Sequence, residues 1–410
     1  MTVWIIEPHD PLIFRDGRPF DSTPGASARS LSFPFPSTIA GGLRTQAGLD
    51  QNGDFQKSKT TIDYVKSISI KGPFLVELDG ESKITNWLLP APQDAMLLEI
   101  SPTDKTNVKI KKLVPIKIDP DEAFTDLDSC PTTLSLVGML SLPTNPTKPY
   151  SQAPKFWYWC KLAEWLLEAK DIDKLTISQL GHNGPQEEIR THVKIDPKNQ
   201  TAQEGLLFQT RGLEFIHAGE AGKAGKNFSE SKRLAIAVET LETKVDITKG
   251  LAPLAGERRL VAWNKSSREF PFSQLLPSIA EKISQTGACR VILLTPGYFE
   301  NICNPTYLLK GMKSIKPELK AVAVARPQVI SGWDFDQNCA KPTRRLAPAG
   351  TVFFLKFEPQ SDKEVIKKWV ESIWLNSVSD DQQSRLDGFG IAILGTWSDK
   401  NEQMQMEVEQ

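Results

Sequence analysis

Residues 351–397, "TVFFLKFEPQSDKEVIKKWVESIWLNSVSDDQQSRLDGFGIAILGTW", decide the predicted fold. The first seven residues are a short apolar run, and the last ten are a second apolar run with a glycine near each end. Between them, Val365, Ile366, Trp369, Val370 and Ile373 recur at the spacing of one helix face. A strand, an amphipathic helix and a second strand predict a βαβ crossover.

The preceding sequence extends this unit. Apolar alternation predicts strands in residues 233–247, 290–299 and 319–334, the last with a bulge at Arg326 and Pro327, and residues 272–288 predict a helix that Pro277 interrupts. This order is the split βαβ of a ferredoxin-like domain. A looser version begins with a strand at residues 2–8 and a helix from Ser37.

The predicted fold class is therefore α+β, with two tandem ferredoxin-like (RRM-like) domains and long irregular insertions. We expect an N-terminal domain in residues 1–200, with an insertion at about 100–150 that is rich in Pro, Thr and Asp. The C-terminal domain is expected in residues 201–410 and includes a glycine-rich loop. A length of 410 residues agrees with two domains, because a single core rarely exceeds about 250–300 residues.

Bulk composition excludes several classes. The sequence has no run of 18 apolar residues, and "MTVWIIEPHD" lacks the features of a signal peptide, so neither a membrane span nor secretion is expected. The five cysteines are scattered without C-x-x-C, which argues against zinc and disulfides and favours a reducing cytoplasm. Net charge is −1, but residues 310–356 hold nine Lys/Arg against three Asp/Glu, a local balance of +6. Residues 358–410 hold five bases against eleven acids, a balance of −6.

Motifs for catalysis are missing from the sequence. "GEAGKAGKN" has neither the glycine spacing nor the Ser/Thr of a P-loop. Asp10, Asp16 and Asp21 are close enough in sequence for Mg²⁺, yet each lies beside Pro, Gly or Ser, where Asp commonly forms turns. No catalytic residue, cofactor or metal ligand is therefore assigned.

What recurs instead is a basic residue beside Gly or Pro in expected loops, in "FRDGRPF", "LAGERRLVAWN", "ARPQVISGWD" and "KPTRRLAPAG". Such residues bind phosphates and unstacked bases when they lie above a sheet. The basic residues concerned are Arg15, Arg18, Arg258, Arg259, Arg326, Lys341, Arg344 and Arg345. The alternative is that these basic residues pair with nearby acids, which suits Arg18 and Arg258. It suits Lys341, Arg344 and Arg345 less well, because no acid lies between Asp336 and Glu358.

The stretch "RSLSFPFPSTIAGGLRT" (residues 29–45) predicts an extended segment followed by a helix, with Ser37 or Thr38 as N-cap. Gly41 and Gly42 would lie in its first turn, where glycine costs about 0.5–1 kcal/mol relative to alanine. Either the helix packs tightly at the glycines, or their amides cradle a phosphate at the helix N-terminus.

Several of these blocks together resemble one family. "WIIEPHDPLIFRDGRPF", "GASARSLSFPFPSTIAGGLRT", "HVKIDPKNQTAQEGLLFQTRGLEF", "LAGERRLVAW", "KPTRRLAPAGTVFF" and "GFGIAILGTW" are similar to the third component of the Cmr-type (type III-B) CRISPR effector, a RAMP-superfamily subunit. The blocks run from residue 3 to 397, and residues 100–150 match nothing in the family.

The resemblance implies two RRM-like domains and a non-catalytic subunit that binds the 5′ tag of the crRNA. Implied partners are the crRNA, the large palm-domain subunit, the filament backbone subunit and, indirectly, target RNA. It favours the phosphate cradle at Gly41 and Gly42, flanked by Arg29 and Arg44, and adds Gly388, Phe389 and Gly390 to the basic residues above as RNA-binding.

Two other functions stay open at this point. Some RAMP relatives cleave repeat RNA with a histidine, and His9 and His192 are the candidates for such an endoribonuclease. A purely structural scaffold without RNA contact is the third possibility.

Overall fold

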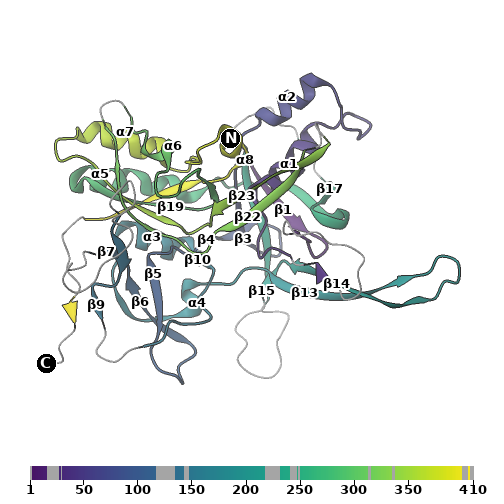
Figure 1. Cartoon of the computed structure of the whole chain (residues 1–410), viewed down its shortest axis with the longest axis horizontal. Helices are drawn as coiled ribbons and strands as arrows, with labels where there is room; N and C mark the ends of the chain where they lie inside the picture. Colours follow the sequence, from purple (N-terminus) through teal and green to yellow (C-terminus); the bar gives the residue numbers. More distant parts are fainter. Residues whose placement is uncertain are drawn as a thin grey trace. The chain divides into compact units, whose positions relative to one another are not determined.

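The computed structural model describes residues 2–15, 27–28, 30–116, 134–142, 147–217, 231–240, 247, 250–312, 315–334, 338–398 and 405–406. The chain forms two compact units of mixed α and β structure, each built from three separate segments. Figure 1 shows its helices and strands. Unit 1 comprises Met1–Thr85, Gly184–Glu269 and Gln328–Leu346; unit 2 comprises Asn86–Asn183, Phe270–Pro327 and Ala347–Gln410. A single boundary near residue 200 was therefore wrong, because each unit takes strands from both halves of the sequence.

Unit 1 is built on a sheet whose centre is β1 (Thr2–Pro8). Its order within the unit is β3-β16-β1-β18-β17, and β16 runs antiparallel to both β1 and β3. The other four strands are β3 (Ile70–Leu78), β16 (Lys232–Thr240), β17 (Gly250–Leu254) and β18 (Arg259–Lys265). Because β1 and β3 are parallel on either side of β16, the chain from β1 to β3 is a split βαβ unit. The segment containing β16 was expected to open the second domain, and this was wrong.

Helix α1 (Pro36–Ala47) connects β1 to β3 and buries Ile39, Ala40 and Leu43, so the helix predicted after the extended segment is confirmed. Its first residue is Pro36, and the N-cap Phe35 makes no side-chain capping bond. A proline suits this position because its fixed φ is helical and the missing N–H would have no helical partner. The predicted N-cap at Ser37 or Thr38 was therefore wrong. Helix α2 (Lys59–Ser67) follows, capped by the Ser58 side chain.

Two hairpins complete unit 1. Strands β13 (Gln186–Ile195) and β14 (Ala202–Glu214) form a long antiparallel pair, as do β22 (Gln328–Asp334) and β23 (Cys339–Ala347). Short strands β2 (Ser27–Ala28) and β15 (Ile216–His217) pair with β14 and β16. The bulge expected at Arg326 and Pro327 is instead a break between a strand that ends at Ala323 and β22.

The main sheet of unit 2 has the order β21-β24-β19-β25, and every neighbouring pair is antiparallel. Its strands are β19 (Ala288–Leu293), β21 (Glu318–Ala323), β24 (Val352–Lys356) and β25 (Ala392–Thr396). Helix α7 (Lys363–Ile373) joins β24 to β25 across β19 and packs beside α5 (Leu276–Thr286). The strand–helix–strand prediction for residues 351–397 is confirmed, with Ile366, Trp369, Val370 and Ile373 buried.

The remainder of unit 2 consists of short elements. The strands are β4 (Ile84–Pro90), β5 (Ala95–Glu99), β6 (Asn107–Lys112), β7 (Val114–Ile116), β8 (Leu136–Gly138), β9 (Ser141–Leu142), β10 (Phe156–Tyr158), β11 (Ile172–Thr176), β12 (Gly181–His182), β20 (Gly297–Tyr298) and β26 (Gln405–Met406). The helices are α3 (Trp159–Leu167), α4 (Ile177–Leu180), α6 (Thr306–Leu309) and α8 (Gln382–Asp387). Strands β6, β7 and β8 lie in the stretch of residues 100–150 that was expected to be irregular, so that expectation was wrong for the part the structure describes.

Candidate nucleic-acid interface

The most unusual backbone of unit 1 lies between β17 and β18, in "AGER" (residues 255–258). Ala255, Glu257 and Arg258 have φ of +64°, +57° and +51°, in the left-handed region that residues with a Cβ rarely adopt. Each such residue costs on the order of 1–3 kcal/mol and persists only where the surroundings enforce it. Strain of this kind concentrates at functional sites, which marks the 255–258 turn as a candidate.

Main-chain contacts on both sides enforce this turn. The Gly256 N–H donates to the Ile13 carbonyl at 2.9 Å, and a Cβ at Gly256 would lie 3.1 Å from that oxygen, so the close approach favours glycine. Beyond the turn, the Leu260 N–H donates to the Asp10 carboxylate at 3.2 Å. The His9 N–H donates to the Leu260 carbonyl at 3.0 Å. The segment after β1 therefore holds the turn in place.

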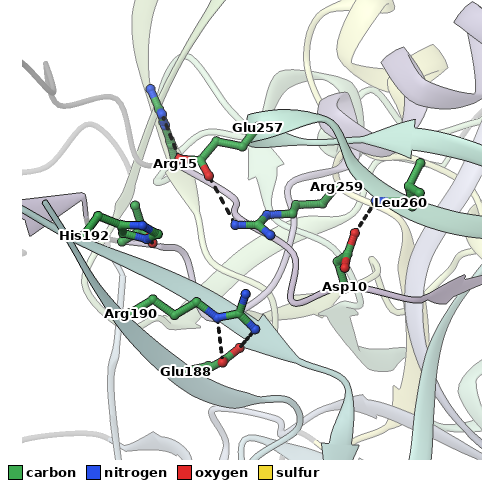
Figure 2. A network of polar contacts seen from close by, with 9 residues as sticks. Asp10, Arg15, Glu188, Arg190, His192, Glu257, Arg259 and Leu260 are labelled. Atoms are coloured by element: carbon green, nitrogen blue, oxygen red, sulfur yellow. Dashed lines mark hydrogen bonds and ion pairs between the residues drawn. The ribbon is translucent and has the colours of Figure 1, made fainter. Parts of the chain in front are cut away.

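The turn brings two of the predicted RNA-binding arginines, Arg15 and Arg259, to one carboxylate (Figure 2). Glu257 accepts a hydrogen bond from Arg259 Nη2 at 3.2 Å and forms an ion pair with Arg15 Nη2 at 3.8 Å. Arg258 is exposed, and no hydrogen bond or ion pair joins its side chain to another residue that the structure describes. The exposed guanidinium of Arg258 is therefore available to an anion such as a phosphate.

A fourth arginine, Arg190 on β13, belongs to the same network and was missed by the sequence analysis (Figure 2). Glu188 holds its guanidinium through two hydrogen bonds of 2.8 and 3.2 Å, and this raises the pKa of Arg190. Burial, together with the carboxylates of Glu188 and Asp10, raises the pKa of Glu214 above its ordinary value. Nothing in the local sequence of β13 places Arg190 beside residues 10–15.

His192, a candidate for the endoribonuclease alternative, follows Arg190 by two positions on β13, and Figure 2 shows both side chains. Its Nε2 is 2.8 Å from the Thr210 hydroxyl, and its ring stacks on Phe208 with centroids 5.1 Å apart. Among the described residues, no hydrogen bond joins His192 to a carboxylate or to a second histidine. Metal-independent RNA cleavage needs a positioned base and a positioned acid, so this geometry supplies at most one of the two groups.

The predicted cluster Lys341, Arg344 and Arg345 lies on strand β23, not in a loop before the next strand as expected. The hairpin register sets Arg345 opposite Val329, whose side chain is 51% exposed. It sets Arg344 opposite Ile330, which is buried. Lys341 and Arg345 are exposed, so the accessible charge of this hairpin comes chiefly from these two residues.

On α1, the two glycines have different surroundings. A Cβ on Gly42 would lie 2.5 Å from Leu254 Cδ1, whereas one on Gly41 would meet no atom within 4 Å. Both follow the first turn that begins at Pro36, so their amides belong to the helical hydrogen-bond ladder and do not form a bare N-terminal cradle. The amide cradle was therefore wrong, and Gly42 serves packing. Arg44 Nη2 donates to the Ile68 carbonyl at 2.9 Å and braces the helix.

The glycine-rich segment Gly388, Phe389 and Gly390 in unit 2 is buried. Its carbonyls accept from Thr295, Ser377 and Val378, and its amides donate to Arg385, Ser384 and Pro296. Every main-chain polar group of the segment is thus bonded within the protein, so none of these groups is left over to bind RNA. Gly388 and Gly390 adopt φ of +91° and +70°, which explains the glycines as a tight turn.

The remaining predicted residues are placed simply. Arg326 is exposed at the end of the second segment of unit 2. Arg18 and Arg29 lie outside the described residues, as do Asp16 and Asp21. Within the described part of the chain, no group of three or more His, Cys, Asp or Glu side chains is arranged to hold a metal ion. No helix among these residues has the length and apolarity to cross a membrane.

Exposed guanidinium groups on a strained turn and on a hairpin have the chemistry of a phosphate-binding surface. The family model described as "CRISPR-associated protein (Cas_Cmr3)" matches residues 4–397, and the chain belongs to this family. The resemblance to a Cmr-type subunit is thereby confirmed. No curated protein sequence matches the chain.

Solved structures with a similar arrangement include two from type III-B complexes. One, "Type III-B Cmr-beta bound to cognate target RNA", has 15% identity and a TM-score of 0.46 and covers 86% of each chain. A second, bound to cognate target RNA and AMPPnP, has 16% identity and a TM-score of 0.43, covering 90% of this chain and 88% of the other. A chain of the type III-A Csm3-Csm4 subcomplex has 10% identity and a TM-score of 0.35, with coverages of 87% and 93%.

Proposed function

We propose that the chain is a non-catalytic subunit of a type III-B CRISPR ribonucleoprotein and binds the 5′ tag of the crRNA. The observation that carries this proposal is the 255–258 turn, which presents Arg258 at the surface of a member of the Cmr3 family. Guanidinium groups bind phosphate through two parallel donors, and RNA-binding surfaces take much of their affinity from such contacts. Lys341 and Arg345 on the β22–β23 hairpin, and Arg190 on β13, extend the proposed surface in unit 1.

The strand orders support an assignment of both units to the ferredoxin-like class. The strand order is β3-β16-β1-β18 in unit 1 and β21-β24-β19-β25 in unit 2. In unit 1 the parallel strands β1 and β3 lie on either side of the antiparallel strand β16. In unit 2 the parallel strands β24 and β25 lie on either side of the antiparallel strand β19. RRM domains use sheets of this class to bind single-stranded RNA, often with stacked aromatic side chains. We infer that both units are RRM-like domains, each with inserted segments.

The family resemblance further supports docking of the large palm-domain subunit and contact with the filament backbone subunit. Target RNA is then read by the guide strand through base pairing, as in other RNA-guided effectors. A non-catalytic role agrees with the surroundings of His192, which bring neither a carboxylate nor a second histidine among the described residues.

Photocrosslinking tests the proposal. The assembled complex is loaded with crRNA that carries a photoreactive nucleotide in its 5′ tag, and the crosslinked peptides of this chain are mapped. We expect adducts in residues 250–265 or 328–346, and fewer adducts with Arg258→Ala. Adducts confined to other subunits would identify the chain as a scaffold.

A second measurement tests the endoribonuclease alternative. The purified chain is incubated with repeat RNA in the absence of metal, and we expect the RNA to stay intact. Specific cleavage that disappears in His9→Ala or His192→Ala would replace the non-catalytic assignment with the nuclease.

A further inference from the structure

A carboxylate at the centre of a phosphate-binding site needs a reason, because a negative charge repels RNA. Glu257 is such a group, since its neighbours in the site are Arg15, Arg258 and Arg259. If Glu257 acted only through its charge, its neutralisation would strengthen RNA binding. The contacts of Glu257 point to a different role.

Glu257 connects two arginines that come from distant parts of the chain. Arg15 follows β1 and Arg259 begins β18, and the two Oε atoms of Glu257 contact one guanidinium each (Figure 2). The Arg259 Nε is buried and has no hydrogen-bond partner among the described residues, and the hydrogen bond from Nη2 to Glu257 anchors this guanidinium. Without the carboxylate, Arg259 loses this hydrogen bond and Arg15 loses one ion pair, so RNA binding must remove more rotameric freedom.

The backbone adds a second reason. Glu257 and Arg258 both have left-handed backbone conformations. This geometry allows Arg259 to donate a hydrogen bond to Glu257, two residues earlier, while the side chain of Arg258 between them stays exposed. The turn is fixed at Ile13 and Leu260, so its geometry exists before any ligand binds. Preorganised donors bind more tightly than mobile ones because less freedom is lost on binding.

We propose that Glu257 is a positioning residue for an RNA phosphate: its carboxylate holds Arg15 and Arg259 on the two sides of the turn that presents Arg258. This inference rests on the proposed function, and it names the group recognised, a backbone phosphate of single-stranded RNA. Such a contact carries no base information, so it contributes equally to RNAs of any sequence.

The test is RNA binding by Glu257→Gln in two backgrounds, measured by fluorescence anisotropy with a fluorescein-labelled single-stranded RNA of mixed sequence. In the wild-type background we expect RNA affinity to fall by about three- to tenfold, because each arginine side chain that is freed must be ordered again when RNA binds. In the Arg15→Ala/Arg259→Ala background Glu257 has nothing to position, and we expect Glu257→Gln to strengthen binding. Glu257→Gln should thus weaken RNA binding in one background and strengthen it in the other. A residue that only stabilised the fold would change RNA affinity in the same direction in both.

Matched variants separate the possible causes. Glu257→Asn tolerates the left-handed backbone and should weaken binding as Glu257→Gln does, because the carboxylate is lost in both. Glu81→Gln removes the same charge from an exposed site in unit 1 that pairs with Lys83, and it should leave affinity unchanged. Thermal unfolding of each variant checks that the chain is folded.

The outcomes are distinct. Tighter RNA binding by Glu257→Gln in the wild-type background would overturn the inference, and so would an equal loss in both backgrounds. If Arg258→Ala and Arg15→Ala/Arg259→Ala both bind RNA as the wild type does, the turn is not an RNA site and the inference fails, whereas the proposed function is decided by crosslinking to residues 328–346.

Discussion

Arg290 and Asp94 form an ion pair that is almost completely enclosed in unit 2, with side-chain exposures of 2% and 1%. Asp94 also accepts a hydrogen bond from the Trp165 indole at 2.9 Å. Arg290 further donates to the carbonyls of Trp165 and Thr396, at 2.6 and 2.9 Å. One guanidinium therefore joins β19 to α3 and β25, elements that lie more than a hundred residues apart in the sequence.

This pair gives the first prediction. Arg290→Ala leaves Asp94 buried without its counter-charge, so we expect the free energy of unfolding to fall by about 3–5 kcal/mol. Urea denaturation of the full chain measures the change. The double variant Arg290→Met/Asp94→Leu removes both charges and should be destabilised less than Arg290→Ala. A single variant as stable as the wild type would show that the pair contributes nothing to the fold.

The two glycines of α1 give the second prediction. Gly42→Val places methyl groups against Leu254, and we expect a loss of about 1–3 kcal/mol from overpacking. Gly41→Ala points into open space, and we expect a gain of about 0.5–1 kcal/mol from helix propensity. Thermal unfolding of the pair checks both signs. Equal effects at the two positions would contradict the packing difference between them.

The β22–β23 hairpin gives the third prediction. For single strands, log affinity falls with log salt by about 0.7 per neutralised phosphate, so Lys341→Ala and Arg345→Ala should each flatten that slope by about 0.7. The slope is measured by titrating a labelled single-stranded RNA at several salt concentrations. Lys155→Ala, an exposed lysine of unit 2, is the control that should keep the wild-type slope. An unchanged slope in both hairpin variants would remove the hairpin from the RNA surface.

The raised pKa of Glu214 gives the fourth prediction. A carboxyl whose folded pKa lies above its unfolded value contributes stability that is fully present below the unfolded pKa of about 4.3 and is lost as pH rises through the folded pKa. Glu214→Gln should therefore have a higher unfolding temperature than the wild type at pH 7. The difference should vanish near pH 4. Glu187→Gln, which breaks the ion pair with Arg211, should show no such gain. A difference that stays constant between pH 4 and 7 would argue against a charge effect.

Local pattern predicted the secondary structure well where apolar periodicity was strong. Residues 351–397 fold as the predicted strand, helix and strand, because alternation and helical spacing depend only on neighbouring residues. The pattern of β16 identified it as a strand but not its partners, β1 and β3, which are reached only through contacts more than 150 residues away. The domain boundary failed for the same reason.

The candidate site divides in the same way. Local sequence was enough to single out Arg258 and Arg259 beside Gly256, because residue type and turn chemistry suffice for this. The close approach of Gly256 to Ile13 became apparent only in the folded chain. The local sequence does not show burial. Gly388 and Gly390 were therefore predicted to lie in an RNA-binding loop, although their main-chain groups are all bonded within the protein. Only the tertiary structure brought Arg15 and Arg259 to one carboxylate, because the segment after β1 and the start of β18 meet through sheet pairing, which no local pattern encodes.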